Sequence, residues 1–203
     1  MKAQQWLVAG VVGLVLASSA RADSEVPRHW IARIGIHPVH PKPDGNGTFE
    51  VDSDAGFSLG ATYLFSKHWA LEMFAAFPRP HELHIDDESV GSFEMIPTTA
   101  TVQYHVTDAS GRMRAYLGIG IGHASIGSEQ TRASLAGRDL EIDDASGVTA
   151  EAGIDMDIGS KWFVNLDARW LDLNSTLQLD GGGNQRFIID PYMFGLSIGR
   201  RLR

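Results

Sequence analysis

The chain has 203 residues, a formal net charge of −8 at pH 7 and no cysteine. Its length suits a single domain, and the acidic balance argues against nucleic acid as a partner. Without cysteine, an exported chain has no disulfide to stabilise it. Its stability must then come from packing, from burial in lipid or from a closed network of hydrogen bonds.

The first residues are typical of a secretory signal peptide. Lys2 precedes an apolar run from Trp6 to Ala17, and the small residues Ala20 and Ala22 follow. The alternative, an amino-terminal membrane anchor, is disfavoured because the run is shorter than the ~20 apolar residues that a membrane-spanning helix needs. We therefore expect residues 1–22 to be a signal peptide and residues 23–203 to form one exported domain.

After this leader, apolar and polar residues alternate in eight segments. Alternation with a period of two is typical of a β-strand that has one apolar and one polar face. Strands of roughly ten residues match the length that a tilted membrane-spanning strand requires. The segments cover residues 30–36, 57–65, 69–77, 96–104, 113–121, 148–158, 162–170 and 192–198.

The connections between these segments alternate in length. Short turns cover residues 66–68, 107–112 and 159–161, whereas long connections cover 38–54, 78–95, 123–146 and 172–190. Short turns on one side and long loops on the other are typical of a bacterial outer-membrane barrel, with the short turns in the periplasm.

The aromatic residues favour a barrel whose apolar face meets lipid. Trp30, Trp69, Trp162 and Trp170 all lie in the apolar register, each at the end of a predicted strand. The alternative, a soluble barrel with its apolar face inward, has no reason to place its largest rings only at the rims. The remaining members of two aromatic girdles would be Phe65 and Tyr104 on the short-turn side and Phe57, Phe77 and Tyr192 on the long-loop side.

We therefore predict an all-β fold, in which residues 23–203 form an eight-stranded antiparallel transmembrane β-barrel in the bacterial cell outer membrane. The polar positions of each strand then face a lumen that is just wide enough for side chains to fill. In its periplasmic half, charged residues must pair, because a lone buried charge is very costly. This predicted polar plug consists of Arg33, Glu72, Arg114, Asp155, Asp157, Asp167 and Arg201, with Gln103 and His105 beside them.

The extracellular half of the lumen is predicted to be mostly apolar. A concave, mostly apolar cavity is the usual form of a small-molecule site. The alternative is that these side chains only pack against one another. The residues are Phe74, Ala76, Pro97, Leu171 and Met193 from the strands, with His37 and Gly120, and Leu83, Ile85 and Phe93 from the second long loop.

Pro97 lies inside the predicted strand 96–104. Proline cannot donate a hydrogen bond to a neighbouring strand, which confines it to edges and bulges. Two interpretations remain open. Pro97 marks a gap in the barrel wall through which an apolar ligand leaves sideways into the membrane, or it only begins the strand.

Four stretches of the chain resemble the OmpW family of outer-membrane proteins. They are MIPTTATVQYHVTDASGRMRAYLGIGIGH (95–123), FAAFPRPHELHI (74–85), KWFVNLDARWLDLNS (161–175) and IIDPYMFGLSIG (188–199). The resemblance implies an eight-stranded barrel with a narrow hydrophobic channel, associated with uptake of small hydrophobic molecules. Barrels of this kind usually end in an aromatic residue that assists assembly, whereas here Leu202 occupies that position and Arg203 follows it.

Two functions fit these observations. The first is passive uptake of small hydrophobic molecules through a narrow channel, with lateral release into the membrane. The second is a structural or interaction barrel whose acidic loops bind divalent cations, lipopolysaccharide, phage or host surfaces. The expected partners are small hydrophobic molecules, outer-membrane lipid and lipopolysaccharide, and the barrel-assembly machinery.

We expect no enzymatic activity, no cofactor and no metal site. A barrel enzyme acting on lipids needs a serine or histidine at the lipid face, and the outward positions of the eight segments contain neither. The motifs HPVHP (37–41) and HELHIDDE (81–88) carry side chains that can hold zinc or copper. Solvated histidines and carboxylates in loops are, however, more often unliganded.

Overall fold

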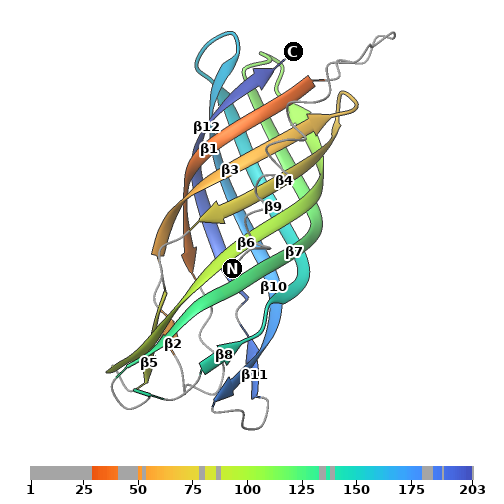
Figure 1. The fold of residues 1–203 in the computed structure, drawn as a ribbon. Coiled ribbons are helices and arrows are strands. Elements are labelled where there is room, and N and C mark those ends of the chain that lie inside the picture. Colours follow the sequence, from red (N-terminus) through yellow and green to blue (C-terminus); the bar gives the residue numbers. More distant parts are fainter. Residues whose placement is uncertain are drawn as a thin grey trace.

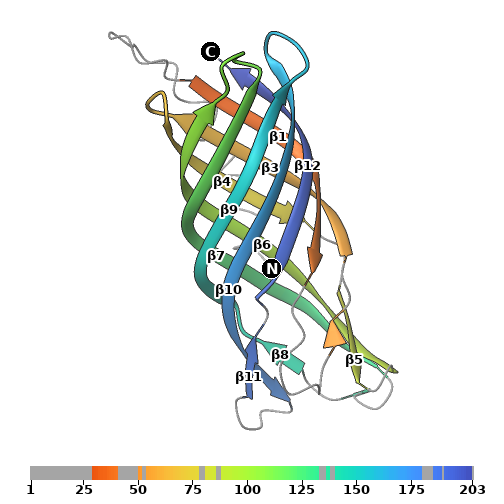
Figure 2. The same cartoon turned by 180° about the vertical axis from the view of Figure 1, so that it is seen from behind.

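Eight long strands, joined edge to edge, close on themselves to form a tube (Figures 1 and 2). The computed structural model describes residues 29–40, 50–51, 54–77, 81–85, 88–132, 136–137, 140–179, 185–188 and 190–202. Residues 1–22, the predicted signal peptide, lie outside this set. In the part of the chain that the structure describes, no helix has the length and hydropathy to cross a membrane.

Each long strand runs antiparallel to both of its neighbours. Around the tube the order is β1, β3, β4, β6, β7, β9, β10 and β12, and β12 pairs with β1 to close it. The predicted all-β fold and its eight alternating strands are confirmed. The strands are β1 (His29–His40), β3 (Asp54–Leu64), β4 (Trp69–Phe77), β6 (Glu88–Thr107), β7 (Met113–Thr131), β9 (Ala145–Asp157), β10 (Trp162–Leu179) and β12 (Tyr192–Leu202).

Several strands continue beyond the predicted segments. The prediction of loops over 88–95, 123–131 and 172–179 was wrong, because β6, β7 and β10 run through these residues as strands of 20, 19 and 18 residues. Pairing between β6 and β7 reaches Gly91 and Thr131, which satisfies backbone groups that would otherwise need water or a side chain. The alternation of apolar and polar residues weakens in these extensions, so the sequence pattern did not indicate them.

Four short strands lie at the long-loop end of the tube, at the bottom of Figure 1. They are β2 (Glu50–Val51), β5 (His81–Ile85), β8 (Leu140–Ile142) and β11 (Gln185–Ile188). β5 pairs with both β2 and β6, whereas β8 and β11 both pair with β10. The long connections therefore extend the sheet beyond the barrel itself.

The outward face of the tube carries a continuous apolar band. On β7, for example, Leu117, Ile119 and Ile121 are 68–73% exposed although each is a large aliphatic side chain. Water would penalise this exposure, whereas lipid accommodates it. The prediction that the apolar register faces outward is confirmed.

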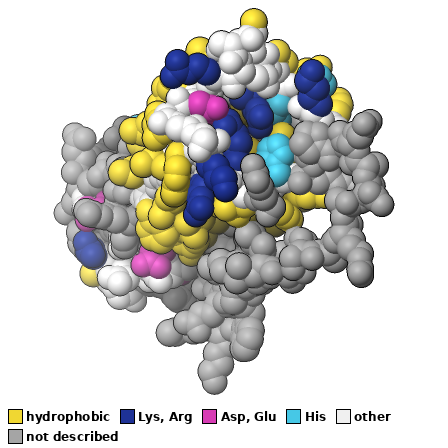
Figure 3. All heavy atoms as spheres, turned by 90° about the horizontal axis from the view of Figure 1, so that it is seen from above, with side chains coloured by type: hydrophobic (Ala, Val, Ile, Leu, Met, Phe, Trp, Pro, Cys, Tyr) yellow, Lys and Arg dark blue, Asp and Glu magenta, His cyan; other side chains and the backbone are white. Residues whose placement is uncertain are grey.

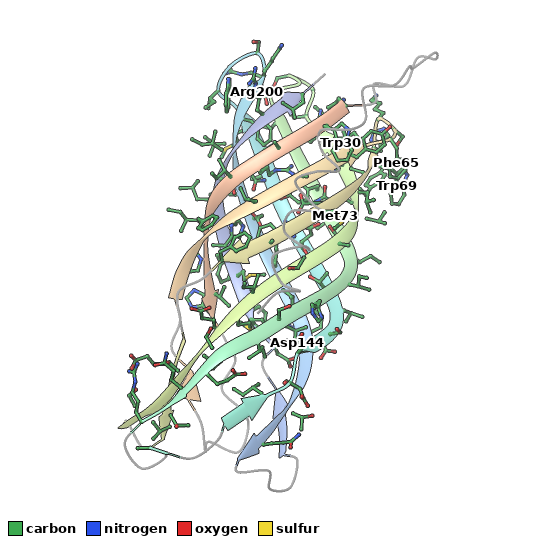
Figure 4. The ribbon with its side chains drawn as sticks, in the orientation of Figure 1. Trp30, Phe65, Trp69, Met73, Asp144 and Arg200 are labelled. Carbon is green, nitrogen blue, oxygen red and sulfur yellow. The ribbon has the colours of Figure 1, made fainter. Side chains whose placement is uncertain are left out.

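Aromatic rings gather where the apolar band meets the short-turn end. The centroids of Trp30 and Tyr63 are 4.9 Å apart, and those of Trp69 and Tyr104 are 5.1 Å apart. Figure 4 shows Trp30 and Trp69 near this end, together with Phe65. Such a rim is the aromatic girdle that anchors a barrel at the membrane interface.

The other end of the band agrees with the prediction only in part. Phe57 and Phe77 stack there, with their centroids 4.8 Å apart. Trp170, in contrast, does not end a strand, because β10 continues to Leu179. It nevertheless pairs with Tyr192, the first residue of β12.

The turn between β6 and β7 is short because the side chain of Asp108 organises its backbone. The carboxylate of Asp108 accepts hydrogen bonds from the Ser110 hydroxyl and from the N–H groups of Ser110 (3.3 Å) and Met113 (2.9 Å). These hydrogen bonds, led by that of the Ser110 hydroxyl, lower the pKa of Asp108 below its ordinary value. Gly111 adopts a φ of 72°, which few other residues tolerate.

Candidate functional site in the barrel lumen

The inward positions of the strands fill the tube with side chains. The largest of them fit because glycines face them from neighbouring strands. A Cβ at Gly199 would overlap the ring of Phe163, and a Cβ at Gly153 would overlap the ring of Tyr116. Close packing of this kind is expected in an eight-stranded barrel, so side chains occupy the lumen near the short turns.

Arg169 of β10 lies at the centre of the charged half of the lumen. Its guanidinium pairs with Glu72, with Glu151 (2.7 Å between Nη2 and Oε2) and with Asp167 (3.2 Å between Nε and Oδ2). Nη1 also donates to the hydroxyl of Thr99 at 3.1 Å. The Arg169 side chain is 2% exposed, and a charge so buried is retained only where partners satisfy it.

Arg33 of β1 extends this network toward the short turns. Its Nη1 lies 2.9 Å from Oε2 of Glu72, and its Nη2 lies 3.2 Å from Oδ2 of Asp155. The hydroxyl of Thr62 accepts from Nη1 at 2.5 Å, and the amide of Asn165 donates to Asp155 at 2.8 Å. Glu72 therefore joins Arg33 and Arg169 in one network that reaches from β1 to β10.

Aromatic rings alternate with the arginines along the tube. The Cζ of Arg169 is 3.9 Å from the ring centroid of Phe74. Farther toward the short turns, the Cζ atoms of Arg33 and Arg201 lie 5.4 and 5.1 Å from the ring centroid of Phe163. Each of these contacts is a cation–π interaction, which is stronger in a desolvated lumen than at a surface.

The mouth at the short-turn end contains a further set of charged groups. Arg201 forms a two-point ion pair with Asp157, with distances of 2.9 and 2.6 Å. Arg114 also faces inward, but its buried Nε and Nη1 have no hydrogen-bond partner among the described residues. The same is true of Nδ1 of His105, whose Nε2 lies 2.9 Å from Oε1 of Gln103.

An apolar cluster fills the half of the lumen near the long loops. His37 marks its boundary with the charged network, with Nε2 3.0 Å from Asp167 and Nδ1 2.7 Å from the Ser58 hydroxyl. The rings of His37 and Phe74 meet edge to face. The cluster members are 0–7% exposed: Val39, Phe74, Ala76, Val90, Phe93, Met95, Ala124, Ile126, Ile142, Ala145, Leu171, Leu173 and Met193.

The pairing of β4 with β6 ends beside this cluster. It runs from Trp69–Tyr104 to Ala75–Thr98, and Pro97 comes next. In the described part of the wall, the last two residues of β4 pair with β3 but not with β6, whereas β6 continues to pair with β7 through Pro97–Ala124. Pro97 lies well inside β6 and therefore does not begin the strand.

The structure places most of the predicted lumen residues inside the tube. Leu83 and Ile85 belong to β5, but their side chains lie outside the described set. Phe93, predicted in a loop, is a buried strand residue of β6. Of the predicted channel and plug residues, Phe74, Ala76, Pro97, Leu171, Met193, Arg33, Glu72, Asp155 and Asp167 are buried, and Arg114, Asp157 and Arg201 are partly exposed at the mouth.

Sequence analysis missed the central residue of the charged network. Arg169 lies between the outward-facing Ala168 and Trp170, so its position in the alternation already places it in the lumen. The alternation over residues 148–158 did predict that Glu151 faces the lumen, and Glu151 is one of the partners of Arg169. Phe163 and Tyr116, which fill the lumen near the short turns, were also not predicted there, although the alternation places both of them inward.

Strand residues beyond the eight predicted segments add a histidine and a serine to the outward positions. The extension of β7 places His123 and Ser125 there, and Nδ1 of His123 is 2.9 Å from the Ser146 hydroxyl. Asp144, labelled in Figure 4, lies 3.7 Å from Nε2 of His123. That distance is too long for the hydrogen bond with which a carboxylate orients a catalytic histidine.

The histidine motifs do not form a metal centre in the described residues. There, no three His, Asp or Glu side chains are placed to hold a metal ion. His37 of the first motif instead contacts Asp167 and Ser58 inside the lumen. Asp86 and Asp87 of the second motif lie outside the described set.

A closed tube with an outward apolar band, an aromatic rim and a charged lumen defines a bacterial outer-membrane β-barrel. Comparison with known proteins agrees with this class. A model of the OmpW family matches residues 34–202, and the chain belongs to the OmpW family.

Similar proteins cover most of the chain. Outer membrane protein W of Vibrio cholerae is 26% identical over 95% of this chain and 97% of its own length. The dibenzothiophene metabolism operon protein DoxH of Pseudomonas sp. strain C18 is 24% identical over 78% of this chain and 76% of its own length. The crystal structure of OprG from Pseudomonas aeruginosa has the same fold, with a TM-score of 0.75, 22% identity, and coverage of 89% of this chain and 98% of that one.

Proposed function

We propose that this barrel is a narrow hydrophobic channel for passive uptake of small hydrophobic molecules, which leave sideways into the membrane. The observation that carries the proposal is the end of β4–β6 pairing at Pro97, directly beside the buried apolar cluster. An apolar lining next to an interruption in the wall gives an apolar molecule a path that avoids water.

The charged network supports a sideways exit rather than a straight path. An apolar molecule that moved past Phe74 toward the periplasm would meet Arg169, whose side chain is 2% exposed and paired with three carboxylates. Separating these ions, or displacing their hydrogen bonds, costs several kcal/mol, roughly 3–5 when one partner is lost. Exit into lipid requires no such cost.

The channel lining is proposed to comprise the residues predicted from the sequence. Phe74 lies against Arg169 of the charged network. Leu171 and Met193 belong to the same buried apolar cluster as Phe74. Pro97 lies at the exit. Ala76, Leu83, Ile85 and Phe93 complete the set, with the side chains of Leu83 and Ile85 included from sequence alone.

One relative supports the chemistry of the ligand. DoxH is named for an operon of dibenzothiophene metabolism, and dibenzothiophene is an apolar aromatic molecule. We extend this class of ligand to the present chain. On this proposal the barrel is no enzyme, needs no cofactor, and meets outer-membrane lipid, lipopolysaccharide and the barrel-assembly machinery as its other partners.

A disulfide across the interruption tests the exit. The chain has no cysteine, so the double variant Phe77→Cys/Ile96→Cys introduces a single possible bridge. These two outward positions would continue the β4–β6 pairing past Pro97. In liposomes, we expect the oxidised variant to take up an apolar solute no faster than protein-free vesicles, and the reduced variant to regain uptake.

The matched control is Ala75→Cys/Thr98→Cys, which bridges the last pair already formed. Its oxidation should leave uptake unchanged. If the disulfide does not form at 77 and 96, a longer bifunctional thiol reagent can cross-link the two cysteines and so join β4 to β6. Unchanged uptake after closure would contradict the lateral exit, and equal uptake by wild-type and empty liposomes would contradict the channel.

A second candidate function is supported by one observation. The apolar cluster is only 0–7% exposed, as a self-packed core would be. A barrel packed in this way would serve as a scaffold whose acidic loops meet divalent cations, lipopolysaccharide, phage or host surfaces. Under this alternative, wild-type liposomes would show no specific uptake of apolar solutes, whereas binding to such surfaces would persist.

A further inference from the structure

Arg114, at the short-turn mouth of the lumen, is a cationic group that forms no ion pair with the residues that the structure describes. Arg114 lies opposite Asp155 in the pairing of β7 with β9. It interacts electrostatically with Asp155 and Asp157, and with the cations Arg33 and Arg201. Both oxygens of Asp155 accept hydrogen bonds from Arg33, and both oxygens of Asp157 accept them from Arg201. Each carboxylate is thus already matched to another arginine.

The hydrogen-bond donors of Arg114 are likewise left without partners. Its Nε and Nη1 are buried and have no hydrogen-bond partner among the described residues. The Nε atoms of Arg33 and Arg201 are also buried and also have no hydrogen-bond partner among the described residues. An unmatched buried donor is destabilising, and more so when it carries charge, so this arrangement favours an anion at the mouth.

His105 favours an anion that carries an O–H group. The amide nitrogen of Gln103 donates to Glu151 at 2.8 Å, so its carbonyl oxygen accepts from Nε2 of His105 at 2.9 Å. Nδ1 of the neutral ring then carries a lone pair, and it has no partner in the described chain. Stacking on Tyr116 holds the ring in place. The ring can accept a hydrogen bond from an O–H group.

We propose that the periplasmic mouth binds a protonated oxyanion of the hydrogen phosphate class, held by Arg114 and oriented by His105. Phosphate oxygens accept from the guanidinium, and the phosphate O–H donates to Nδ1 of His105. Figure 3 looks onto this end of the tube, where Lys and Arg side chains gather beside a carboxylate and a histidine. This site is separate from the proposed apolar channel, because the Arg33–Glu72–Arg169 network lies between them.

The test measures binding of inorganic phosphate to the folded barrel in maltoside micelles, which contain no phosphate. Equilibrium dialysis at constant ionic strength should give saturable binding of one phosphate per barrel. Sulfate, which has no O–H at pH 7, should compete less well, and chloride should not compete. Absence of saturable phosphate binding by the wild-type barrel overturns the proposal, as does equal competition by chloride.

A matched pair of variants locates the site. Arg114→Gln should weaken phosphate binding at least tenfold. Arg112→Gln removes the same charge from the exposed turn at the same end and should leave binding within twofold. Equal losses in both variants would show that only surface charge attracts the anion, and would overturn the site.

Thermal stability gives an independent readout. Without phosphate, Arg114→Gln should raise the unfolding midpoint above that of the wild type, because it removes an unpaired cation beside Arg201. Phosphate should raise the midpoint of the wild type but not that of the variant, since only a binding barrel is stabilised by mass action. A variant less stable than the wild type in phosphate-free buffer contradicts the unpaired state of Arg114.

A further experiment distinguishes a phosphate in solution from the phosphate of a lipid headgroup. In phosphate-free buffer, phosphatidic acid added to the micelles offers the same protonated phosphate on a lipid. Stabilisation by inorganic phosphate alone indicates a periplasmic solute, whereas stabilisation by phosphatidic acid alone indicates a lipid headgroup. Stabilisation by neither overturns the proposal.

Discussion

The two halves of the lumen are lined by the same eight strands, but different interactions hold them together. Near the short turns, Arg33 and Arg169 depend on particular carboxylates at particular distances. Near the long loops, the apolar cluster depends on filled volume, with members 0–7% exposed. A change in the charged half should therefore unpair several groups at once, whereas a change in the apolar half should open or close space.

The largest expected effect is the loss of the central cation. Arg169→Met leaves Glu72, Glu151 and Asp167 without their shared partner, and we expect the free energy of unfolding to fall by about 3–5 kcal/mol. Urea unfolding of the barrel in micelles, followed by the heat-dependent shift of its gel band, measures this loss.

Arg200→Met is the matched control for this experiment. Arg200 faces outward over the ring of Trp162, with its Cζ 5.3 Å from the ring centroid, and its loss should cost no more than about 1 kcal/mol. Adding Glu151→Gln to Arg169→Met should recover part of the stability. Equal, small effects of Arg169→Met and Arg200→Met would erase the distinction between the charged half and the surface.

A smaller effect is expected from a cavity in the apolar half. Leu171→Ala should lower the free energy of unfolding by about 2–4 kcal/mol, since Leu171 is fully buried and its neighbours cannot collapse completely. Leu166→Ala is the control on the same strand, where the side chain is 46% exposed to lipid. The control should cost less, because lipid chains fill the space.

This pair of variants also sharpens the proposal of a channel. A small apolar solute that enters the space left by Leu171→Ala should restore part of the lost stability by mass action. The same solute should have little effect on Leu166→Ala. Equal costs for the two variants would mean that the apolar half is packed no more tightly than the lipid face.

The smallest effect concerns the boundary between the halves. Phe74→Asp would place a carboxylate beside Arg169, whose Cζ lies 3.9 Å from the present ring centroid, so the barrel should still fold. Uptake of apolar solutes should fall by roughly tenfold, equivalent to ~1.4 kcal/mol, because the charged half would extend into the apolar half. Liposome uptake measures the change, with Phe74→Leu as the apolar control. Uptake at the wild-type rate by folded Phe74→Asp would show that solutes do not pass this residue.

Much of the fold was predictable because lipid and lumen impose opposite requirements on alternate residues. Leu117, Ile119 and Ile121 had to face lipid, and Arg114 and Asp155 then had to face inward. The extensions of β6, β7 and β10 were not predictable in this way. Beyond the lipid band both faces can be polar, so alternation no longer distinguishes a strand from a loop.

The sequence by itself thus determined the number of membrane strands, the face that each presents to lipid, and the list of charges inside the tube. Only the tertiary structure decided which charges meet. Arg169 and Glu72 are 97 residues apart in the chain, and they pair because the stagger between strands brings β4 and β10 to the same level of the tube. The same stagger assigns Asp155 to Arg33 and Asp157 to Arg201, and leaves Arg114 outside the ion pairs of the described residues. The sequence pattern specifies a face and, from the strand ends, an approximate height, but it does not specify the stagger between strands, so the partners of each buried charge follow from the closed barrel alone.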